Sequence, residues 1–301
     1  MKTSLPAETH NLYSELLERL LIFSARHAIG YAPGTFTTKS VAGETYVYFQ
    51  YSEPGGSKRQ LYLGKEGPAL RHLAERFKSQ RQEVRQERAD FERLCAQILA
   101  GGGWAMWTGP ARVLRAFADA GVFETGAILV GTHAFGVIGN LLGVRWEGAH
   151  IRTQDVDLAA VSLAAAPERL RADAPKALER LEMGFLPVPG LDPRHASASF
   201  KVRGQSLRVD FLAPGKPGAP VLLPSLSTSA QPLPFLDYLI ENPGKVAVLD
   251  ASGFLVLVPA PARFALHKIL VSSERSASQE TKALKDLAQA AQLLEHLSEA
   301  R

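Results

Sequence analysis

Apolar residues recur at helical spacing in two stretches of the first hundred residues. From about Pro6 to Ala28, leucines and Phe23 return every three or four positions, a pattern that predicts an amphipathic helix. The segment from Gly67 to Ala100 is charged and rich in strong helix formers, which predicts a long helix. Between the two, the aromatic and β-branched runs TYVYFQYSE and KRQLYLG flank the turn-forming sequence PGGS and predict a β-hairpin.

Beyond the glycine run Gly101 to Gly103, short predicted strands and helices alternate. PARVLRAFADAG predicts a helix, AILVG a buried strand, and AFGVIGNLLG a helix that begins just past Gly131 and Thr132. Two strands follow, DVDLAAV and QSLRVDFLA, with the helix APERLRADAPKALERLEM and a Pro-rich loop between them. A variable Pro/Ser segment from Leu223 to Pro234 precedes the strands KVAVLD and FLVLVP, the helix ARFALHKILVSSE and a last helix from about Gln279 to Leu297.

We place the main domain boundary at the glycine run, because glycines end a helix and composition changes there. The predicted division has three parts. Residues 1–103 hold a helix, the hairpin and the long charged helix; residues 104–222 hold the core; and residues 223–301 hold the C-terminal strands and helices.

Composition narrows the classes of protein. With 46% hydrophobic and 21% charged residues, the chain can bury a substantial core and is not disordered throughout. The net charge of +4 permits an anionic partner without requiring one. Cys95 is the single cysteine, which excludes an intrachain disulfide and a cysteine-rich zinc site and fits a reducing cytosol. Charges scattered through the N-terminal segment, without a small-residue cleavage site, argue against a signal peptide, so we expect a cytoplasmic protein.

Residues 125–144 carry no charged side chain and are about as long as a bilayer span. Five glycines together with Thr132, His133 and Asn140 lower the hydrophobicity of this stretch, and no basic cluster flanks it. We therefore expect no membrane partner.

Two features of residues 1–103 allow a nucleic-acid contact. The aromatic residues of the hairpin, followed by Lys58 and Arg59, could stack on bases and neutralise phosphates. Ordinary hairpin packing is the favoured interpretation, since exposed aromatic faces usually meet a neighbouring element. In the long helix, basic residues are interleaved with acidic ones, which is typical of a solvated, salt-bridged surface.

Three aspartates provide the candidate chemistry. Alternate side chains of a strand share a face, so Asp155 and Asp157 in DVDLAAV point the same way while Val156 and Leu158 enter the core. Two carboxylates this close favour a cation between them, and Mg²⁺ is the natural choice. Asp210, in SLRVDFL, lies opposite its apolar neighbours; the alternative is a strand-end aspartate that caps a turn. Beside the other two, it would complete a site for two ions.

The turn at Gly131 and Thr132 opens a helix, where backbone N–H groups and the helix dipole favour phosphate. By itself this signal is weak, since tight helix packing also uses glycine and no P-loop or dinucleotide fingerprint is present. His133 lies in the same turn and could contact phosphate or base, although a histidine at a helix start commonly packs. Arg152 is a further phosphate candidate, because guanidinium matches phosphate geometry and Arg152 precedes the Asp155 strand. We expect the three tryptophans to lie in the core.

Taken together, these elements resemble the nucleotidyltransferase superfamily related to DNA polymerase β, over roughly residues 105 to 290. In that superfamily a small-residue turn opens a helix, an Asp-x-Asp pair follows and a third aspartate completes the metal site. GTHAFGVIGNLLGVRW followed by RTQDVDLA is similar to a bacterial subgroup of minimal nucleotidyltransferases, some of them near abortive-infection toxins. The resemblance implies an α+β fold: a nucleotidyltransferase core of mixed sheet and flanking helices, with the N-terminal helix and hairpin region before it and C-terminal helices after it.

The resemblance also implies the roles of the candidate residues. Asp155, Asp157 and Asp210 would hold two Mg²⁺ ions, with Mn²⁺ as a substitute, and Gly131 and Thr132 would bind the triphosphate. VPAPARFALHKILVSSER and KALKDLAQA look like helices whose lysines, here Lys268 and Lys285, reach the nucleotide phosphates; ordinary surface charge is the equal alternative.

The function implied is metal-dependent transfer of a nucleoside monophosphate from a nucleoside triphosphate such as ATP to an acceptor hydroxyl on an RNA end or a protein. A toxin with an antitoxin partner is one version of this enzyme. The alternative is a non-catalytic nucleic-acid-binding module on a nucleotidyltransferase scaffold. Retention of all three aspartates favours catalysis, and the sequence does not choose the acceptor.

Overall fold

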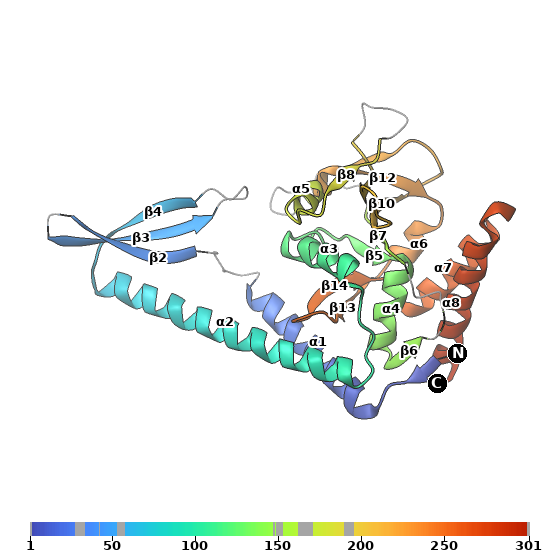
Figure 1. Cartoon of the computed structure of the whole chain (residues 1–301), viewed down its shortest axis with the longest axis horizontal. Coiled ribbons are helices and arrows are strands. Elements are labelled where there is room, and N and C mark those ends of the chain that lie inside the picture. Colours follow the sequence, from blue (N-terminus) through green and yellow to red (C-terminus); the bar gives the residue numbers. More distant parts are fainter. Residues whose placement is uncertain are drawn as a thin grey trace. The chain divides into compact units, whose positions relative to one another are not determined.

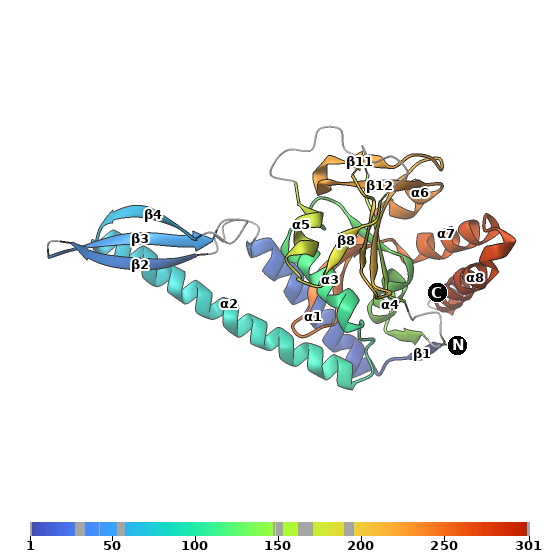
Figure 2. The same ribbon diagram turned by 45° about the horizontal axis from the view of Figure 1, so that its top comes forward.

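The structure is a computed structural model of the whole chain, shown in Figure 1 and, turned, in Figure 2. It describes residues 2–27, 34–41, 43–52, 58–146, 148, 153–161, 171–189 and 196–299. The chain forms two compact units, one of residues 21–93 and one of residues 1–20 with 94–301. The three-part division at Gly103 and Leu222 stays a prediction.

The unit of residues 21–93 contains a three-stranded antiparallel sheet and most of a long helix. The strands are β2 (Gly34–Val41), β3 (Glu44–Ser52) and β4 (Lys58–Lys65), in the order β2-β3-β4, and the helix α2 (Pro68–Ala100) starts here. The hairpin of β3 and β4 and the long helix confirm the prediction. Strand β2 was not predicted, because its sequence GTFTTKSV has only two large apolar residues.

One mixed sheet forms the centre of the other unit. Its strands run in the order β11-β12-β10-β7-β5, and β8 and β9 extend it from β10. Strands β7 and β10 are parallel, whereas β5 is antiparallel to β7. The fold is therefore α+β with a mixed sheet, as predicted. The bounds are β5 (Ile128–Val130), β7 (Asp155–Ala159), β8 (Phe185–Pro187), β9 (Ser199–Val202), β10 (Arg208–Pro214), β11 (Val221–Leu223) and β12 (Thr228–Leu233).

Helices and two small ribbons surround this sheet (Figure 1). The ribbons pair β1 with β6 and β13 with β14, both antiparallel. The strands are β1 (Lys2–Ser4), β6 (Val144–Trp146), β13 (Gly244–Val248) and β14 (Phe254–Val258). The helices are α1 (Ala7–His27), α3 (Thr108–Asp119), α4 (Gly131–Leu141), α5 (Ala174–Glu179), α6 (Leu236–Ile240), α7 (Pro261–Ser273) and α8 (Glu280–Glu299), with 3₁₀ turns η3 (Pro224–Leu226) and η4 (Ala277–Gln279).

The segment from Leu223 to Pro234 differs from its prediction, because it contains η3 and strand β12. Strand β12 is parallel to β10 through Gln231, Pro232 and Leu233, whereas β11 pairs only with its first half. Proline is tolerated where one side of a strand has no ladder partner, which explains why a proline-containing sequence forms a strand here. Of the helix expected over residues 166–183, the structure describes residues 171–183, and within that part only α5 is helical.

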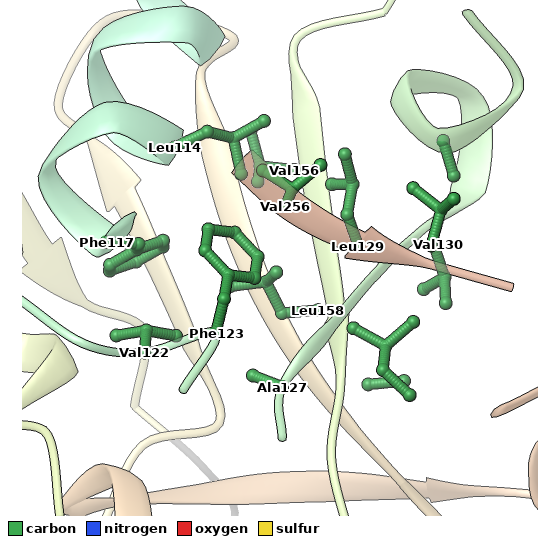
Figure 3. Close-up of a cluster of buried hydrophobic side chains, with 14 of the residues drawn as sticks. Leu114, Phe117, Val122, Phe123, Ala127, Leu129, Val130, Val156, Leu158 and Val256 are labelled. Atoms are coloured by element: carbon green, nitrogen blue, oxygen red, sulfur yellow. The ribbon is translucent and has the colours of Figure 1, made fainter. Parts of the chain in front are cut away.

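A continuous apolar core lies against the sheet, and part of it is drawn in Figure 3. Val156 and Leu158 of β7 are fully buried among side chains of α3, β5 and β14. The alternate residues of β7, Asp155 and Asp157, are exposed and half-buried. The core thus fixes the orientation of β7, as predicted.

Helix α4 is the glycine-rich segment considered above as a membrane span. A side chain at Gly136 would overlap Trp104, and one at Gly139 would overlap Trp146, so these glycines permit close packing. The Asn140 amide bonds to both backbone groups of Trp104, at 2.7 and 2.9 Å. Within the described ranges, no helix meets the length and hydropathy needed to cross a membrane. The core expectation holds for Trp146, 2% exposed, and is wrong for Trp107, 49% exposed.

Candidate functional site

The carboxylates predicted to act together lie on adjacent strands. Asp157 of β7 and Asp210 of β10 are register partners in the parallel ladder, and Asp155 precedes Asp157 on the same face. Strand β10 alternates between half-buried and buried residues, so Asp210 faces away from the core that holds Val209 and Phe211. The interpretation of Asp210 as a turn cap is therefore wrong, and the three aspartates share one face of the sheet.

Gly131 brings the first turn of α4 against these aspartates. Strand β5 pairs with β7 so that Val130 is opposite Asp157, and Gly131 follows with φ of +69°. A Cβ atom at Gly131 would overlap the Asp157 carboxylate. Both the backbone conformation and the close approach to Asp157 thus require glycine at this position.

Electrostatics at Asp157 favour a cation. Burial and the neighbouring Asp210 raise the pKa of Asp157 from 3.8 to about 7, while Lys268 lowers it. The Asp210 carboxylate accepts hydrogen bonds from the Ser199 hydroxyl and from Arg208 Nε, the latter at 2.8 Å. Arg208 is the register partner of Asp155, so a guanidinium lies on the carboxylate face.

A basic wall formed by α7, α8 and the connection between them faces the same cavity. It consists of Lys268, Arg275, Lys282 and Lys285, which together with the aspartates line a pocket of about 670 Å³. Asp286, 3% exposed, accepts ion pairs from Lys268 at 2.6 Å and from Arg275 at 2.7 Å. Burial and then Lys268 lower the pKa of Lys285, as expected for cations held close together. The pocket is therefore lined both by the three aspartates of the sheet and by the cations of the basic wall.

The donor set fits a magnesium ion. Mg²⁺ prefers carboxylate oxygens and commonly uses one or two of them together with water and substrate phosphates. Asp155 and Asp157, adjacent on one strand face, can supply those ligands. With Asp210 turned to Arg208 and Ser199, no three His, Cys, Asp or Glu side chains of the described residues are grouped to hold a metal ion. A third ligand from Asp210 would require its carboxylate to exchange Arg208 for the ion.

Among the other predicted residues, Thr132 and the two lysines line the pocket, whereas His133 does not. Thr132 lines the pocket, and its hydroxyl accepts a 3.5 Å hydrogen bond from Gln289 of α8. His133 is 1% exposed and does not line the pocket. Burial, and then the nearby Lys285, lower the pKa of His133 to about 4, so its imidazole is neutral near pH 7. Lys268 and Lys285 line the pocket. Arg152 lies outside the described residues.

Three residues of the site were missed at the sequence level. Arg208 could have been noticed, because it is two residues before Asp210 on the same strand face. Ser199 could not, since it meets Asp210 only through the pairing of β10 with β9, a strand that was not predicted. Asp286 gives no comparable signal, since Lys268 of α7 and Arg275, just after α7, meet it only when α7 and α8 pack together.

One comparison with known proteins identifies the family of the chain. A family model described as Nucleotidyltransferase matches residues 109–301, which is more than half of the chain. The chain belongs to this nucleotidyltransferase family. The match includes β5, α4, the three aspartates and the basic wall, which places the pocket inside the family's common region.

A solved nucleotidyltransferase-like protein is also similar in part. It is an antigenic protein from Paracoccidioides brasiliensis, 14% identical, with 60% of this chain and 76% of that chain covered at a TM-score of 0.34. No curated protein matches this nucleotidyltransferase.

Proposed function

We propose that this nucleotidyltransferase transfers a nucleoside monophosphate from a nucleoside triphosphate to an acceptor hydroxyl and releases pyrophosphate. The observation that carries the proposal is the pairing of Asp157 with Asp210 on parallel strands, with Asp155 on the same face and Gly131 packed against Asp157. A paired carboxylate floor opposite a cationic wall is suited to phosphoryl chemistry, where positioning and charge neutralisation are the main tasks.

Asp155 and Asp157 would hold the Mg²⁺ or Mn²⁺ ions, with Asp210 as the third ligand. When bound, such ions neutralise phosphate charge and lower the pKa of an attacking hydroxyl. The chain itself keeps the two strands in register, so the carboxylates are held on a rigid sheet.

The triphosphate would lie between the start of α4 and the basic wall. The first backbone N–H groups of α4 and the Thr132 hydroxyl can donate to phosphate oxygens. Lys268 and Lys285 would bind the β and γ phosphates and stabilise the pyrophosphate as it leaves. Asp286 keeps Lys268 and Arg275 in place by pairing with both.

The acceptor would be the hydroxyl of an RNA end or of a protein side chain. A toxin role, an antitoxin partner and a cytoplasmic location stay predictions.

Transfer of label from an [α-³²P]nucleoside triphosphate tests the proposal. Each of the four nucleotides is incubated with the protein, Mg²⁺, and total RNA or lysate protein. Asp157→Asn should reduce incorporation at least about a hundredfold, the scale expected when a charge-stabilising group is removed from a transition state. Glu124→Gln, which changes an exposed carboxylate outside the pocket, is the matched control and should keep full activity. Full incorporation by Asp157→Asn would contradict the proposal.

A further inference from the structure

The unit of residues 21–93 carries a feature that the nucleotidyltransferase pocket does not use. Its sheet has one face packed on α2 and one face turned away from α2 (Figures 1 and 2). Phe36, Phe49 and Phe77 fill the α2 side, with ring centroids 5.2 to 5.4 Å apart. Side chains alternate along a strand, so the residues next to Phe49 in β3 lie on the opposite face.

That opposite face carries an aromatic ladder, which we call the tyrosine face. Tyr48 is the register partner of Tyr62, with ring centroids 5.4 Å apart, and Tyr46 lies 6.2 Å from Tyr62. Tyr62 is 56% exposed. Four of the chain's seven tyrosines are in β3 and β4. The tyrosine face comprises Lys39, Tyr46, Tyr48, Gln50, Gln60 and Tyr62.

Polar groups frame these rings. The Lys39 ammonium lies 4.8 Å from the centroid of the Tyr48 ring and donates to Gln60 at 2.8 Å. Gln60 in turn donates to Gln50 at 3.2 Å across the strands. The tyrosine face thus combines the exposed ring of Tyr62, the half-buried rings of Tyr46 and Tyr48, two amide groups and a lysine, and it is not a continuous apolar patch.

The charge of this unit is complementary to a polyanion. Residues 21–93 contain twelve Lys and Arg against eight Asp and Glu, an excess of four positive charges. The whole chain has a net charge of +4, so the remaining residues are neutral in sum. The net positive charge of the chain is therefore carried by the unit that also presents the tyrosines.

We propose that the tyrosine face binds single-stranded nucleic acid, with bases stacked on Tyr48 and Tyr62 and phosphates near Lys39. Stacking on an exposed ring such as that of Tyr62 requires bases that are not paired in a duplex, so single strands are favoured. Such binding goes beyond the proposed function. That the bound strand also supplies the acceptor hydroxyl rests on the proposed function, whereas the binding itself does not.

Fluorescence anisotropy with a labelled twenty-nucleotide single strand tests the inference on the full chain, without nucleotide or Mg²⁺. A Tyr48→Ala/Tyr62→Ala double variant should bind at least about tenfold more weakly, since each base stacked on an aromatic ring contributes to the free energy of binding. The matched Tyr48→Phe/Tyr62→Phe variant keeps both rings and should bind within about twofold of the unchanged chain. Two results would overturn the stacking assignment. The first is an alanine variant that binds as tightly as the unchanged chain, and the second is a phenylalanine variant that loses as much affinity as the alanine variant.

Two further arms make the result independent of folding and of catalysis. Photo-crosslinking of the unchanged chain should attach the strand to β3 or β4, and attachment confined to residues of the pocket would overturn the proposal. Asp157→Asn should bind the strand like the unchanged chain, so that failure of transfer and failure of binding are separable. A duplex of the same sequence should bind at least about tenfold more weakly, and equal binding would overturn the preference for single strands. RNA and DNA versions of the strand differ in the 2′-hydroxyl. The version with the lower dissociation constant identifies which of the two nucleic acids the tyrosine face prefers.

Discussion

At the scale of single residues, Asp157 illustrates how a reactive site reduces stability. Its pKa rises from 3.8 to about 7 on folding, because of burial and the adjacent Asp210. At pH values between 3.8 and about 7, the Asp157 carboxyl keeps its proton in the folded chain and loses it in the unfolded chain. The free energy of unfolding therefore falls as the pH rises from about 4 to 7, and the loss persists above pH 7.

Asp157→Asn should remove this cost. At pH 8 and without divalent cations, we expect the variant to be more stable than the unchanged chain by about 2 kcal/mol, and at pH 4 we expect no difference. Urea unfolding at the two pH values measures both quantities. Asp155→Asn, at an exposed position of the same strand, serves as the control and should change stability little. A variant that is less stable than the unchanged chain at pH 8 would show that the Asp157 carboxylate stabilises the fold.

The carboxylates themselves could be predicted from the sequence, because strand alternation needs only a local pattern. Asp155 and Asp157 were placed on one face by their spacing, and Asp210 by its apolar neighbours. The ion pairs around Asp286 could not be predicted, since they depend on how α7 packs on α8. Nor could the buried, neutral state of His133, which follows from tertiary burial.

At the scale of elements, the junction of β5 and α4 determines how close the phosphate-binding turn comes to the carboxylates. Gly131→Ala should cost roughly 1 to 3 kcal/mol in backbone strain and should also displace Asp157, which its Cβ would overlap. Gly126 provides a matched control, with φ of +92° and no atom within 4 Å of an added Cβ.

We therefore expect both alanine variants to lose stability in thermal unfolding, and only Gly131→Ala to lose nucleotidyl transfer, by at least about tenfold. Equal activity of the two variants would mean that the contact between Gly131 and Asp157 has no catalytic importance.

Most elements were recognisable because their periodicity is local. The helices α1, α2, α3, α4, α7 and α8 and the strands β3, β4, β5, β7, β10, β13 and β14 all match predicted segments. The missed strands have short or polar sequences that depend on a neighbour. Strand β12 contains Pro232 and is a strand because β10 and β11 each pair with part of it.

At the scale of the whole molecule, the two compact units divide the chain after Leu20 and after Arg93, and not at the glycine run Gly101 to Gly103. Tyr13, Leu16 and Leu20 of α1 are buried in the nucleotidyltransferase unit, and the Tyr13 hydroxyl donates to the Ala247 carbonyl at 3.0 Å. Ile98 of α2 is fully buried in the same unit. Residues 7–20 of the first helix therefore belong to this unit.

Two deletions should separate these roles. Replacement of residues 21–93 by a short Gly/Ser linker should leave nucleotide affinity within about threefold, because the pocket residues all belong to the other unit. Removal of residues 1–103 should instead abolish cooperative unfolding, since each large buried side chain lost contributes about 1.5 to 3 kcal/mol. Equilibrium dialysis with a nucleoside triphosphate and calorimetry measure the two outcomes. Loss of nucleotide binding in the linker variant would contradict this division of roles.

The most direct test of the central claim compares two positions of the label in one nucleotide. The protein is incubated with the preferred nucleoside triphosphate, Mg²⁺ and acceptor, with ³²P placed at either the α or the γ phosphate. Transfer of a nucleoside monophosphate predicts that the acceptor gains the α label and that the γ label leaves as pyrophosphate. An acceptor labelled from the γ position alone would contradict the account, because the pocket would then be transferring the terminal phosphate.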